Sequence, residues 1–248
     1  MKCLILAAGY ATRLYPLTEN FPKPLLKVGD KAILDWLIDD LSRTGEIDEY
    51  IVVTNHRFAP IFEEWAAARN KAGGKVTVVD DGTSSNETRL GAVKDIQFAV
   101  EKLGIDNDML VMAGDNLLSF SLKDFLDYWK TKATSCIMRY FEKEEARLHR
   151  SGVVEVDDGG LVLSMEEKPA NPKSHWCCPP FYIYQSSDLK LLPQGLAAGC
   201  GTDAPGSLAA WISTVSPVHA WPMPGPRYDI GTLDSYAEVQ RIFDKTLK

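Results

Sequence analysis

Residues 2–14 read KCLILAAGYATRL, a short apolar run that passes directly into a loop of small residues. Apart from Lys2, the run at 2–6 is apolar and has the length of a strand buried on both faces, which is typical of a parallel sheet. Similar runs follow at 50–53, 76–79 and 109–112. Helix-like stretches separate them, at 33–41, 60–69 and 92–103. This alternation predicts an α/β fold with a mixed, mostly parallel central sheet and helices on both faces.

The second half of the chain has a different pattern, because its strand-like segments follow one another closely. They lie at 136–141, 153–156, 161–165 and 181–184. The sequence Asp-Asp-Gly-Gly at 157–160 is typical of a hairpin turn between two of them. We therefore expect a small β extension or lid on the parallel core. Helices are expected before Thr214 and over about 233–243.

Composition and charge narrow the class of protein. The chain has 248 residues, of which 45% are hydrophobic and 25% charged, as in an ordinary soluble globular protein. Its 27 Lys and Arg against 34 Asp and Glu give a net charge of −7, with no basic tract of five residues, so we expect no nucleic-acid partner. No apolar stretch approaches the roughly 18 residues of a membrane span. The five cysteines form no CxxC pair and predict reduced thiols in a cytoplasmic protein.

The loop that follows the first strand is the first candidate binding segment. In an open α/β sheet, ligands bind beyond the carboxyl ends of the strands. The small residues at 7–9 and 11 would let a phosphate group approach backbone N–H groups closely. The loop matches neither G-x-G-x-x-G nor the P-loop pattern. The structural alternative is a tight turn that leaves Arg13 exposed.

Two cations follow from the same part of the chain, Arg13 and the lysine of Pro22-Lys23-Pro24-Leu25-Leu26. The prolines fix the backbone on either side of Lys23 and limit where its ammonium can point. Together the two side chains are suited to bind phosphate groups. The structural alternative for this segment is a proline corner.

Two aspartates are candidate metal ligands. Asp115 lies in Gly-Asp-Asn at 114–116, directly after the strand at 109–112, and Asp229 lies in Tyr-Asp-Ile-Gly-Thr at 228–232. Two carboxylates with few other ligands suit Mg²⁺, which keeps several waters and is completed by substrate phosphates. Either aspartate could instead cap a turn or helix, and Thr232 is a competing cap beside Asp229.

A third charged group, Glu166-Glu167-Lys168-Pro169, ends another predicted strand. Glu167 could bind the hydroxyls of a phosphorylated ligand and Lys168 its phosphate, although such a run is more often a solvated surface. His175, Cys177 and Cys178 form the one His/Cys cluster, and the sequence offers no fourth ligand for zinc. We expect packing or pocket-wall roles for them.

Taken together, these segments resemble the sugar-1-phosphate nucleotidyltransferase family. The matching motifs are LAAGYATRLYPLT at 6–18, PKPLL at 22–26, LGA at 90–92, GDN at 114–116, SGVVEVD at 151–157, EEKP at 166–169 and YDIGTLDSY at 228–236. The resemblance implies a nucleotide-diphospho-sugar transferase fold in one domain over 1–248. It places a nucleotide-binding part at about 1–135 and an acceptor-binding part at about 136–248.

The resemblance also implies a reaction, the transfer of a nucleotidyl group from an NTP to a sugar 1-phosphate. Mg²⁺-dependent in-line attack on the α-phosphate would release an NDP-sugar and pyrophosphate. The implied nucleotide site comprises Leu6, Ala7, Ala8, Gly9 and Gly91, and Arg13 and Lys23 would act on the phosphates as catalytic residues. Mg²⁺ would be held by Asp115 and Asp229. The acceptor would be bound by Gly152, Glu167 and Lys168.

Three departures from the family pattern matter. Ala11 replaces a loop glycine, which is tolerable if its φ is negative. Cys-Pro-Pro-Phe-Tyr at 178–182 replaces a Gly-x-Tyr strand, and Ser84 to Gly91 replaces a glycine-rich run. The last two leave the sugar and the base open.

Other functions therefore remain under consideration. One is a cytidylyltransferase acting on phosphocholine or a related alcohol phosphate. Binding of choline would need an aromatic cage, and rings are available at Trp176, Phe181, Tyr182, Tyr184 and Tyr228. Polar groups around Glu167 would favour a sugar instead. A further alternative is a non-catalytic nucleotide-sensing protein. A dinucleotide-dependent oxidoreductase is disfavoured by the missing G-x-G-x-x-G.

Overall fold

A computed structural model describes residues 1–246, which divide into two units whose segments alternate along the sequence. Unit 1 comprises Met1–Lys2, Leu90–Met112 and Asp124–Pro224. Unit 2 comprises Cys3–Arg89, Ala113–Lys123 and the chain from Gly225 on. Each unit therefore brings together residues that are far apart in the sequence.

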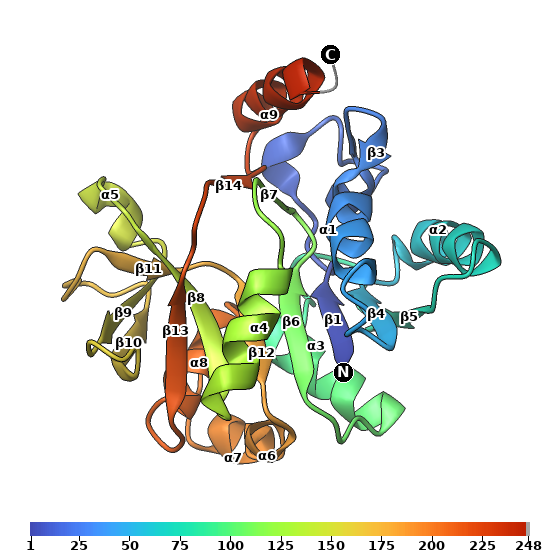
Figure 1. Ribbon diagram of the computed structural model, residues 1–248. Helices are drawn as coiled ribbons and strands as arrows, with labels where there is room; N and C mark the ends of the chain where they lie inside the picture. The colour runs from blue at the N-terminus through green and yellow to red at the C-terminus, as the bar shows by residue number, and fades with distance from the viewer. Residues whose placement is uncertain (247–248) are drawn as a thin grey trace. The chain divides into compact units, whose positions relative to one another are not determined.

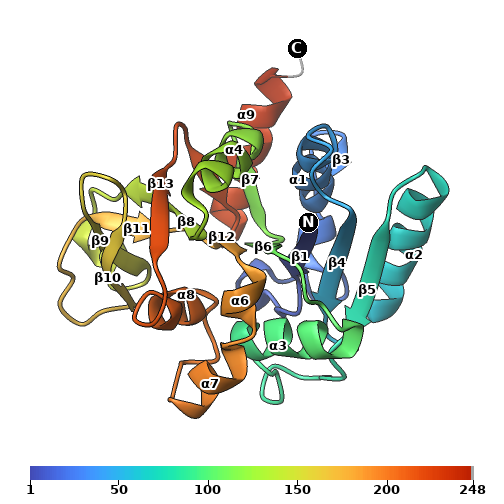
Figure 2. The same ribbon diagram turned by 60° about the horizontal axis from the view of Figure 1, so that its bottom comes forward.

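Unit 2 contains a parallel sheet with strand order β1-β4-β5, two short strand pairs and three helices. Its strands are β1 (Lys2–Leu6), β2 (Lys27–Val28), β3 (Lys31–Ala32), β4 (Glu49–Thr54), β5 (Val76–Asp80), β7 (Asn116–Leu118) and β14 (Arg227–Asp229). Its helices are α1 (Ile33–Ser42), α2 (Ala59–Lys71) and α9 (Leu233–Thr246), with 3₁₀ turns at Thr12–Leu14 and Lys23–Leu25. The strands β4 and β5 lie side by side and α2 packs against β5 (Figures 1 and 2).

Unit 1 has strand order β10-β9-β11-β8-β12-β6, and β13 pairs with β8 in parallel while the other pairs are antiparallel. Its strands are β6 (Met109–Ala113), β8 (Ser135–Phe141), β9 (Gly152–Val156), β10 (Val162–Glu167), β11 (Trp176–Cys178), β12 (Phe181–Tyr184) and β13 (Val218–Pro222). Its helices are α3 (Ala92–Leu103), α4 (Lys123–Lys132), α5 (Glu145–Leu148), α6 (Ser186–Leu189), α7 (Leu192–Ala197) and α8 (Gly206–Ile212). In Figure 2, β9, β10 and β11 lie together, and α8 contacts β9 and β10.

The predicted α/β fold with a mixed sheet is confirmed, and most predicted elements lie within two residues of the observed ones. The hairpin turn joins β9 to β10, and the Gly160 N–H donates to the Asp157 carbonyl at 3.1 Å. The sequence analysis did not identify the helices α4, α5, α6 and α7, the short strands β2, β3, β7, β11 and β14, or the strand β13. The alternating burial of β13, Val-His-Ala-Trp-Pro, explains the last omission because it is not a continuous apolar run.

The helices follow their apolar spacing. In α1 the buried residues are Ile33, Leu34, Leu37, Ile38 and Leu41, which lie on one face of a helix with 3.6 residues per turn. Helix α3 ends at Gly104, whose φ of +60° provides the left-handed cap that glycine adopts without strain. None of the helices within residues 1–246 is long and apolar enough to cross a membrane.

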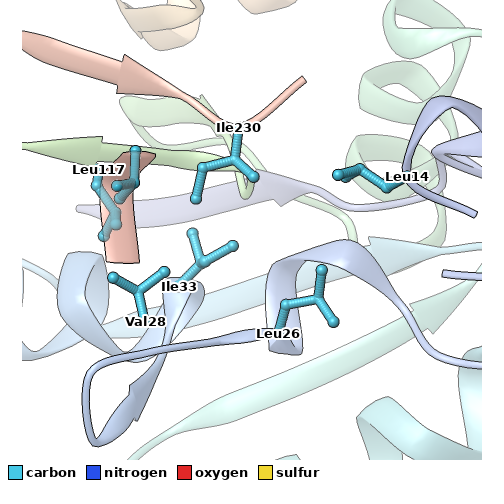
Figure 3. Packing of buried hydrophobic residues seen from close by; sticks show 7 residues of the cluster. Leu14, Leu26, Val28, Ile33, Leu117 and Ile230 are labelled. Carbon is cyan, nitrogen blue, oxygen red and sulfur yellow. The ribbon is translucent and has the colours of Figure 1, made fainter. Parts of the chain in front are cut away.

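A buried cluster in unit 2 joins segments from the whole length of the chain (Figure 3). Its buried members are Leu14, Leu26, Val28, Ile33, Leu117, Ile230 and Val239. Leu14 is next to Arg13, Leu117 is two residues from Asp115, and Ile230 is next to Asp229. The packing of this cluster therefore fixes the backbone from which several predicted site residues project.

We predict that Ile230→Ala destabilises the protein strongly, because Ile230 is fully buried in this cluster. Truncating a buried isoleucine typically costs about 2–5 kcal/mol of unfolding free energy. Urea denaturation followed by circular dichroism measures the change. Leu233→Ala is the matched control, because Leu233 is 43% exposed and its loss should cost less than about 0.5 kcal/mol. Equal losses in the two variants would contradict the role of the cluster.

Candidate active site

The loop after β1 is held by its backbone carbonyls and amides within unit 2. The Ala7 N–H donates to the Val53 carbonyl at 2.9 Å, and the buried Asn55 amide donates from Nδ2 to the Ala8 carbonyl at 2.9 Å. Gly9 is exposed, and a Cβ placed on it would meet no protein atom within 4 Å. The loop is therefore rigidly attached while the backbone at Gly9 stays accessible, as binding of a phosphate requires.

Leu6 connects this loop to the Gly-Asp-Asn motif. Its carbonyl accepts a hydrogen bond from the Gly114 N–H at 3.1 Å. A Cβ on Gly114 would lie 3.0 Å from Ile5 Cγ2 and 3.4 Å from the Pro24 side chain. The absence of a side chain at Gly114 therefore allows close packing of three segments, with the backbone just before Asp115 against Pro24.

Ala11 differs from the expectation of a negative φ. Its φ is +47° and ψ is +41°, in the left-handed region, where an L-residue is strained by about 1–2 kcal/mol. The surrounding bonds hold it there, because its carbonyl accepts from the Leu14 N–H at 2.9 Å and from Thr18 Oγ1 at 2.8 Å. The chain thus keeps the glycine-like conformation although it carries a methyl group.

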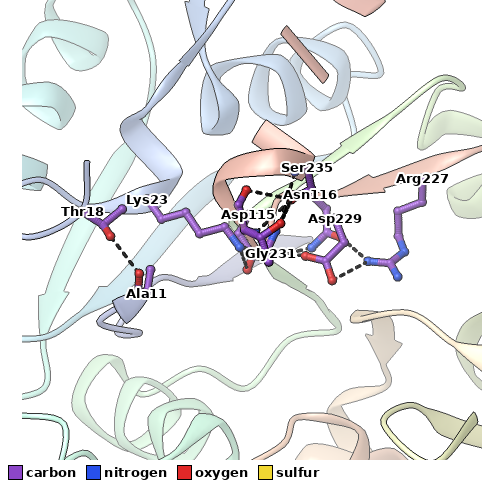
Figure 4. A network of polar contacts seen from close by, with 10 residues as sticks. Ala11, Thr18, Lys23, Asp115, Asn116, Arg227, Asp229, Gly231 and Ser235 are labelled. Carbon is purple, nitrogen blue, oxygen red and sulfur yellow. Dashed lines mark hydrogen bonds and ion pairs between the residues drawn. The ribbon is translucent and has the colours of Figure 1, made fainter. Parts of the chain in front are cut away.

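Lys23 brings the two predicted metal ligands together (Figure 4). Its Nζ lies 2.6 Å from Asp115 Oδ2 and 3.9 Å from Asp229 Oδ1. Only 9% of the Lys23 side chain is exposed, and a buried ammonium needs such counter-ions. The segment is also a proline corner, because Leu25 and Leu26 are buried. The structural interpretation of this motif therefore applies, and the phosphate-binding role of Lys23 stays a prediction.

Arg13 lies in the same part of unit 2. A Cβ on Gly231, two residues after Asp229, would be 3.8 Å from Arg13 Nη2. The guanidinium is in an exposed residue, so it can reach a ligand without losing a buried partner. The structure thus brings together Arg13, Lys23, Asp115 and Asp229.

The cap of α9 shows that Asp229 is not needed there. The Ser235 N–H donates to Thr232 Oγ1 at 3.2 Å, and the Gly231 and Thr232 N–H groups donate to Ser235 Oγ at 3.0 and 2.9 Å. This reciprocal bonding between Thr232 and Ser235, the third residue of the helix, is a capping pattern at the start of α9. Thr232 is the cap, and the Asp229 carboxylate makes ion pairs instead.

Two residues of this network received no role from the sequence, Asn116 and Arg227. Arg227 Nη1 donates to Asn116 Oδ1 and lies 3.9 Å from Asp229 Oδ2, while Asn116 Nδ2 donates to Asp115 Oδ1 at 2.7 Å (Figure 4). The pairing of β14 with β7, which sets Asp229 opposite Asn116, creates this arrangement. Their positions in the sequence could have indicated a role, because Asn116 follows Asp115 directly and Arg227 lies two residues before Asp229.

Glu167 in unit 1 is confined by two glycines. A Cβ on Gly152 would lie 2.9 Å from Glu167 Oε2, and one on Gly206 would lie 2.1 Å from the same oxygen. Burial raises the pKa of the Glu167 carboxyl, an effect that the Lys168 ammonium opposes and Asp203 reinforces. Glu167 is therefore not part of a solvated charge run, and Gly152 and Gly206 make room for its carboxylate.

The loop at 199–207, which the sequence left open as acceptor wall, lid or interface, packs against two predicted binding segments of unit 1. A Cβ on Gly91 would lie 2.6 Å from the Thr202 carbonyl oxygen, and the Val93 N–H donates to that carbonyl at 3.0 Å. Lys168 Nζ lies 3.8 Å from Asp203 Oδ2. Gly91 and Lys168 are thus joined through two successive loop residues.

The aromatic rings proposed for a cage are packed against the protein. Phe181, Tyr182 and Tyr184 are at most 2% exposed, and the Arg139 guanidinium covers the Trp176 ring at 4.2 Å. Tyr228 packs edge-on against Phe243, with ring centroids 6.1 Å apart.

His175 also has a packing partner, because its ring stacks on Phe141 with centroids 5.4 Å apart. Cys177 and Cys178 are buried. Throughout residues 1–246, no group of three or more His, Cys, Asp or Glu side chains is arranged to hold a metal ion.

Comparisons with known proteins identify the family of the chain. Over residues 2–246 the sequence matches the nucleotidyl transferase family. It is 27% identical to a glucose-1-phosphate adenylyltransferase of Fervidobacterium nodosum, over 95% of this chain and 59% of that protein. It is 31% identical to a glucose-1-phosphate thymidylyltransferase of Mycobacterium tuberculosis, over 77% of this chain and 63% of that protein. The chain spans about three fifths of the length of these curated relatives.

A solved structure of apo UDP-glucose pyrophosphorylase has a similar fold. The TM-score is 0.83 at 20% identity, and the match covers 100% of this chain and 99% of the other. This likeness confirms the predicted nucleotide-diphospho-sugar transferase fold.

We predict that Gly91→Ala destabilises the protein by at least about 2 kcal/mol, because a φ of +88° and a backbone carbonyl at 2.6 Å both oppose a side chain. Gly104→Ala, at the other end of α3, is the matched control. Its φ is +60° but a Cβ there meets nothing within 4 Å, so it should cost only about 1 kcal/mol. Urea denaturation compares the two variants. A loss of unfolding free energy no larger in Gly91→Ala than in Gly104→Ala would contradict the prediction and show that residues 202–203 move aside at little cost.

A second prediction concerns pH and Glu167. Because its pKa is raised above the ordinary value of 4.5, the folded protein holds this proton more tightly than the unfolded chain. The ionised carboxylate therefore lowers the free energy of unfolding at pH 7. This destabilisation disappears as the pH falls through the raised pKa towards 4.5, because the carboxyl group becomes protonated. We expect Glu167→Gln to resist urea better than wild type at pH 7, with a gap that closes on acidification. The exposed neighbour Glu166, changed to Gln, is the control, and a gap independent of pH would refute the effect.

Proposed function

Because the chain belongs to the nucleotidyl transferase family, we propose that it transfers a nucleotidyl group from an NTP to the phosphate of a sugar 1-phosphate, with release of pyrophosphate. The observation that carries this proposal is the contact of the Lys23 ammonium with two carboxylates, 2.6 Å from Asp115 and 3.9 Å from Asp229. Such a cluster of opposite charges suits a reaction that must bring several anions together.

The chemistry needs positioning more than proton transfer. An oxygen of the acceptor phosphate attacks the α-phosphorus, the bond from that phosphorus to the oxygen bridging to the β-phosphate breaks, and pyrophosphate leaves with the electron pair. A phosphate monoester is largely dianionic at pH 7, since its second pKa is about 6, so no general base is required. Arg13 and Lys23 would bind the phosphates of the NTP and stabilise the charge that develops on the leaving group.

The implied cofactor is Mg²⁺, and Asp115 and Asp229 fit it. Mg²⁺ is commonly bound through one or two carboxylates, with waters and substrate phosphates completing its shell. That the two carboxylates already share one cation, the Lys23 ammonium, indicates that they can share a metal ion. When bound, the metal would neutralise charge on the phosphate oxygens.

The acceptor would be bound by Gly152, Glu167 and Lys168. The carboxylate of Glu167 suits sugar hydroxyls, and the half-exposed Lys168 ammonium suits a phosphate. The packed state of Trp176, Phe181, Tyr182 and Tyr184 supports a sugar over a quaternary ammonium, which needs open aromatic faces. The base is left open, because the matched relatives are named for adenylyl and thymidylyl transfer.

Pyrophosphate release tests the proposal. With Mg²⁺ present, dTTP, UTP, CTP, GTP and ATP are each combined with sugar 1-phosphates, phosphocholine and glycerol phosphates. We expect release that depends on a sugar 1-phosphate, and the responding pair identifies both substrates. Binding of NTP by calorimetry without release for any acceptor would favour a nucleotide-sensing protein. Loss of NTP binding as well would refute the assignment.

Variants of the charged cluster provide the controls for this assay. Lys23→Ala and Asp115→Asn should each lower turnover about a hundredfold or more while the far-ultraviolet circular dichroism spectrum is retained. Lys31→Ala is the matched control, because Lys31 makes an equally short 2.6 Å ion pair with Asp39 outside this cluster. Near-normal turnover in Lys23→Ala would remove Lys23 from the mechanism.

A further inference from the structure

We propose that the Lys23 ammonium is an internal counter-ion that competes with a divalent cation for Asp115 and Asp229, so that the metal binds tightly only when Lys23 is drawn away to a phosphate. The second half of this inference rests on the proposed function, whereas the competition itself concerns only side chains of unit 2.

The contact distances place Lys23 on the oxygens that a metal would use. Its Nζ lies 2.6 Å from Asp115 Oδ2 and 3.9 Å from Asp229 Oδ1. Mg²⁺ binds carboxylate oxygen at about 2.0–2.1 Å. A divalent ion on Asp115 Oδ2 would therefore have a positively charged nitrogen as its near neighbour, and the two positive charges repel each other.

The other two carboxylate oxygens are held by neighbouring side chains. Asp115 Oδ1 accepts a hydrogen bond from Asn116 Nδ2 at 2.7 Å, and Asp229 Oδ2 lies 3.9 Å from Arg227 Nη1. Arg227 in turn donates to Asn116 Oδ1, so the two contacts form one network (Figure 4). Asp115 Oδ2 and Asp229 Oδ1 are therefore the two oxygens that a metal ion could use. Both of them face the Lys23 ammonium.

The carboxylates of Asp115 and Asp229 are more exposed to solvent than the Lys23 ammonium that contacts them. The Lys23 side chain is only 9% exposed, whereas those of Asp115 and Asp229 are 34% and 57% exposed. A cation from solvent can reach the carboxylates without passing the lysine. Lys23 itself has a fixed backbone between two prolines but a flexible four-carbon stem, so its ammonium can change partner while its Cα stays in place.

Binding of Mn²⁺ alone to the free protein tests the competition. Mn²⁺ replaces Mg²⁺ because its paramagnetic resonance signal reports the free ion directly. Lys23→Met keeps an unbranched side chain that is one atom shorter and removes its charge, and we expect it to bind Mn²⁺ about tenfold or more tightly than wild type. The double variant Lys23→Met with Asp115→Asn should lose this gain. Unchanged or weaker binding by Lys23→Met would overturn the proposal.

Two further variants exclude trivial explanations. Lys31→Met removes the equally short ion pair to Asp39, which keeps Arg69 as a partner at 2.8 Å, and should leave Mn²⁺ affinity within about twofold of wild type. Lys23→Arg retains the charge and should bind Mn²⁺ as weakly as wild type. If Lys23→Met fails to fold, Lys23→Gln, which can still donate to Asp115, replaces it with the same expected gain.

The assay separates this inference from the proposed function. It uses neither a nucleotide nor an acceptor, so pyrophosphate release with no gain in Mn²⁺ affinity refutes the competition alone. A gain in affinity with no NTP binding leaves the competition standing and refutes the transferase. In wild type, a non-hydrolysable NTP should raise Mn²⁺ affinity more than it does in Lys23→Met, because only wild type has a lysine to release.

Discussion

The buried ammonium of Lys23 is the constraint on which the arrangement of the charged side chains in unit 2 depends. An ammonium removed from water must be matched by negative charge, and the chain supplies Asp115 and Asp229 from segments far away in the sequence. Each of these carboxylates has a further partner, Asn116 or Arg227. The cluster is therefore a balanced set of charges in which moving one member changes the surroundings of all the others.

Close packing at glycines shapes the surroundings of two candidate site residues, Asp115 in unit 2 and Glu167 in unit 1. In unit 2, Gly114 lets the strand β1 and Pro24 approach the backbone that carries Asp115. In unit 1, Gly152 and Gly206 leave the space that the Glu167 carboxylate fills. These three glycines thus act by making room for neighbouring side chains, whereas Gly91 has a positive φ and also lies against the Thr202 carbonyl, so that both its conformation and its surroundings oppose a side chain. Ala11 shows the converse, since tight bonding holds it at a positive φ despite its methyl group.

Much of the fold and the chemical class could be predicted from the sequence, and the resemblance to a family of nucleotidyltransferases is confirmed. Helix α3 was predicted with its observed bounds because its apolar spacing is complete within the segment. Strands of two or three residues, such as β7, β11 and β14, are too short to show a period and were not predicted. Arg227 and Asn116 were missed because they lie on two of these short strands. Only the pairing of β14 with β7 brings the two side chains together.

The sequence by itself determined the local structure and the kinds of side chain available for phosphate chemistry. Helical and strand periods are complete within about ten residues, and the motifs around Arg13, Lys23, Asp115 and Asp229 lie within short segments. Only the tertiary structure decided that Lys23 contacts both aspartates, that Thr232 rather than Asp229 caps α9, and that the loop at 199–207 packs against Gly91 and Lys168. The physical reason is that these contacts depend on how distant segments pack around a shared core, such as the cluster of Leu14, Leu117 and Ile230, and no local pattern encodes that packing.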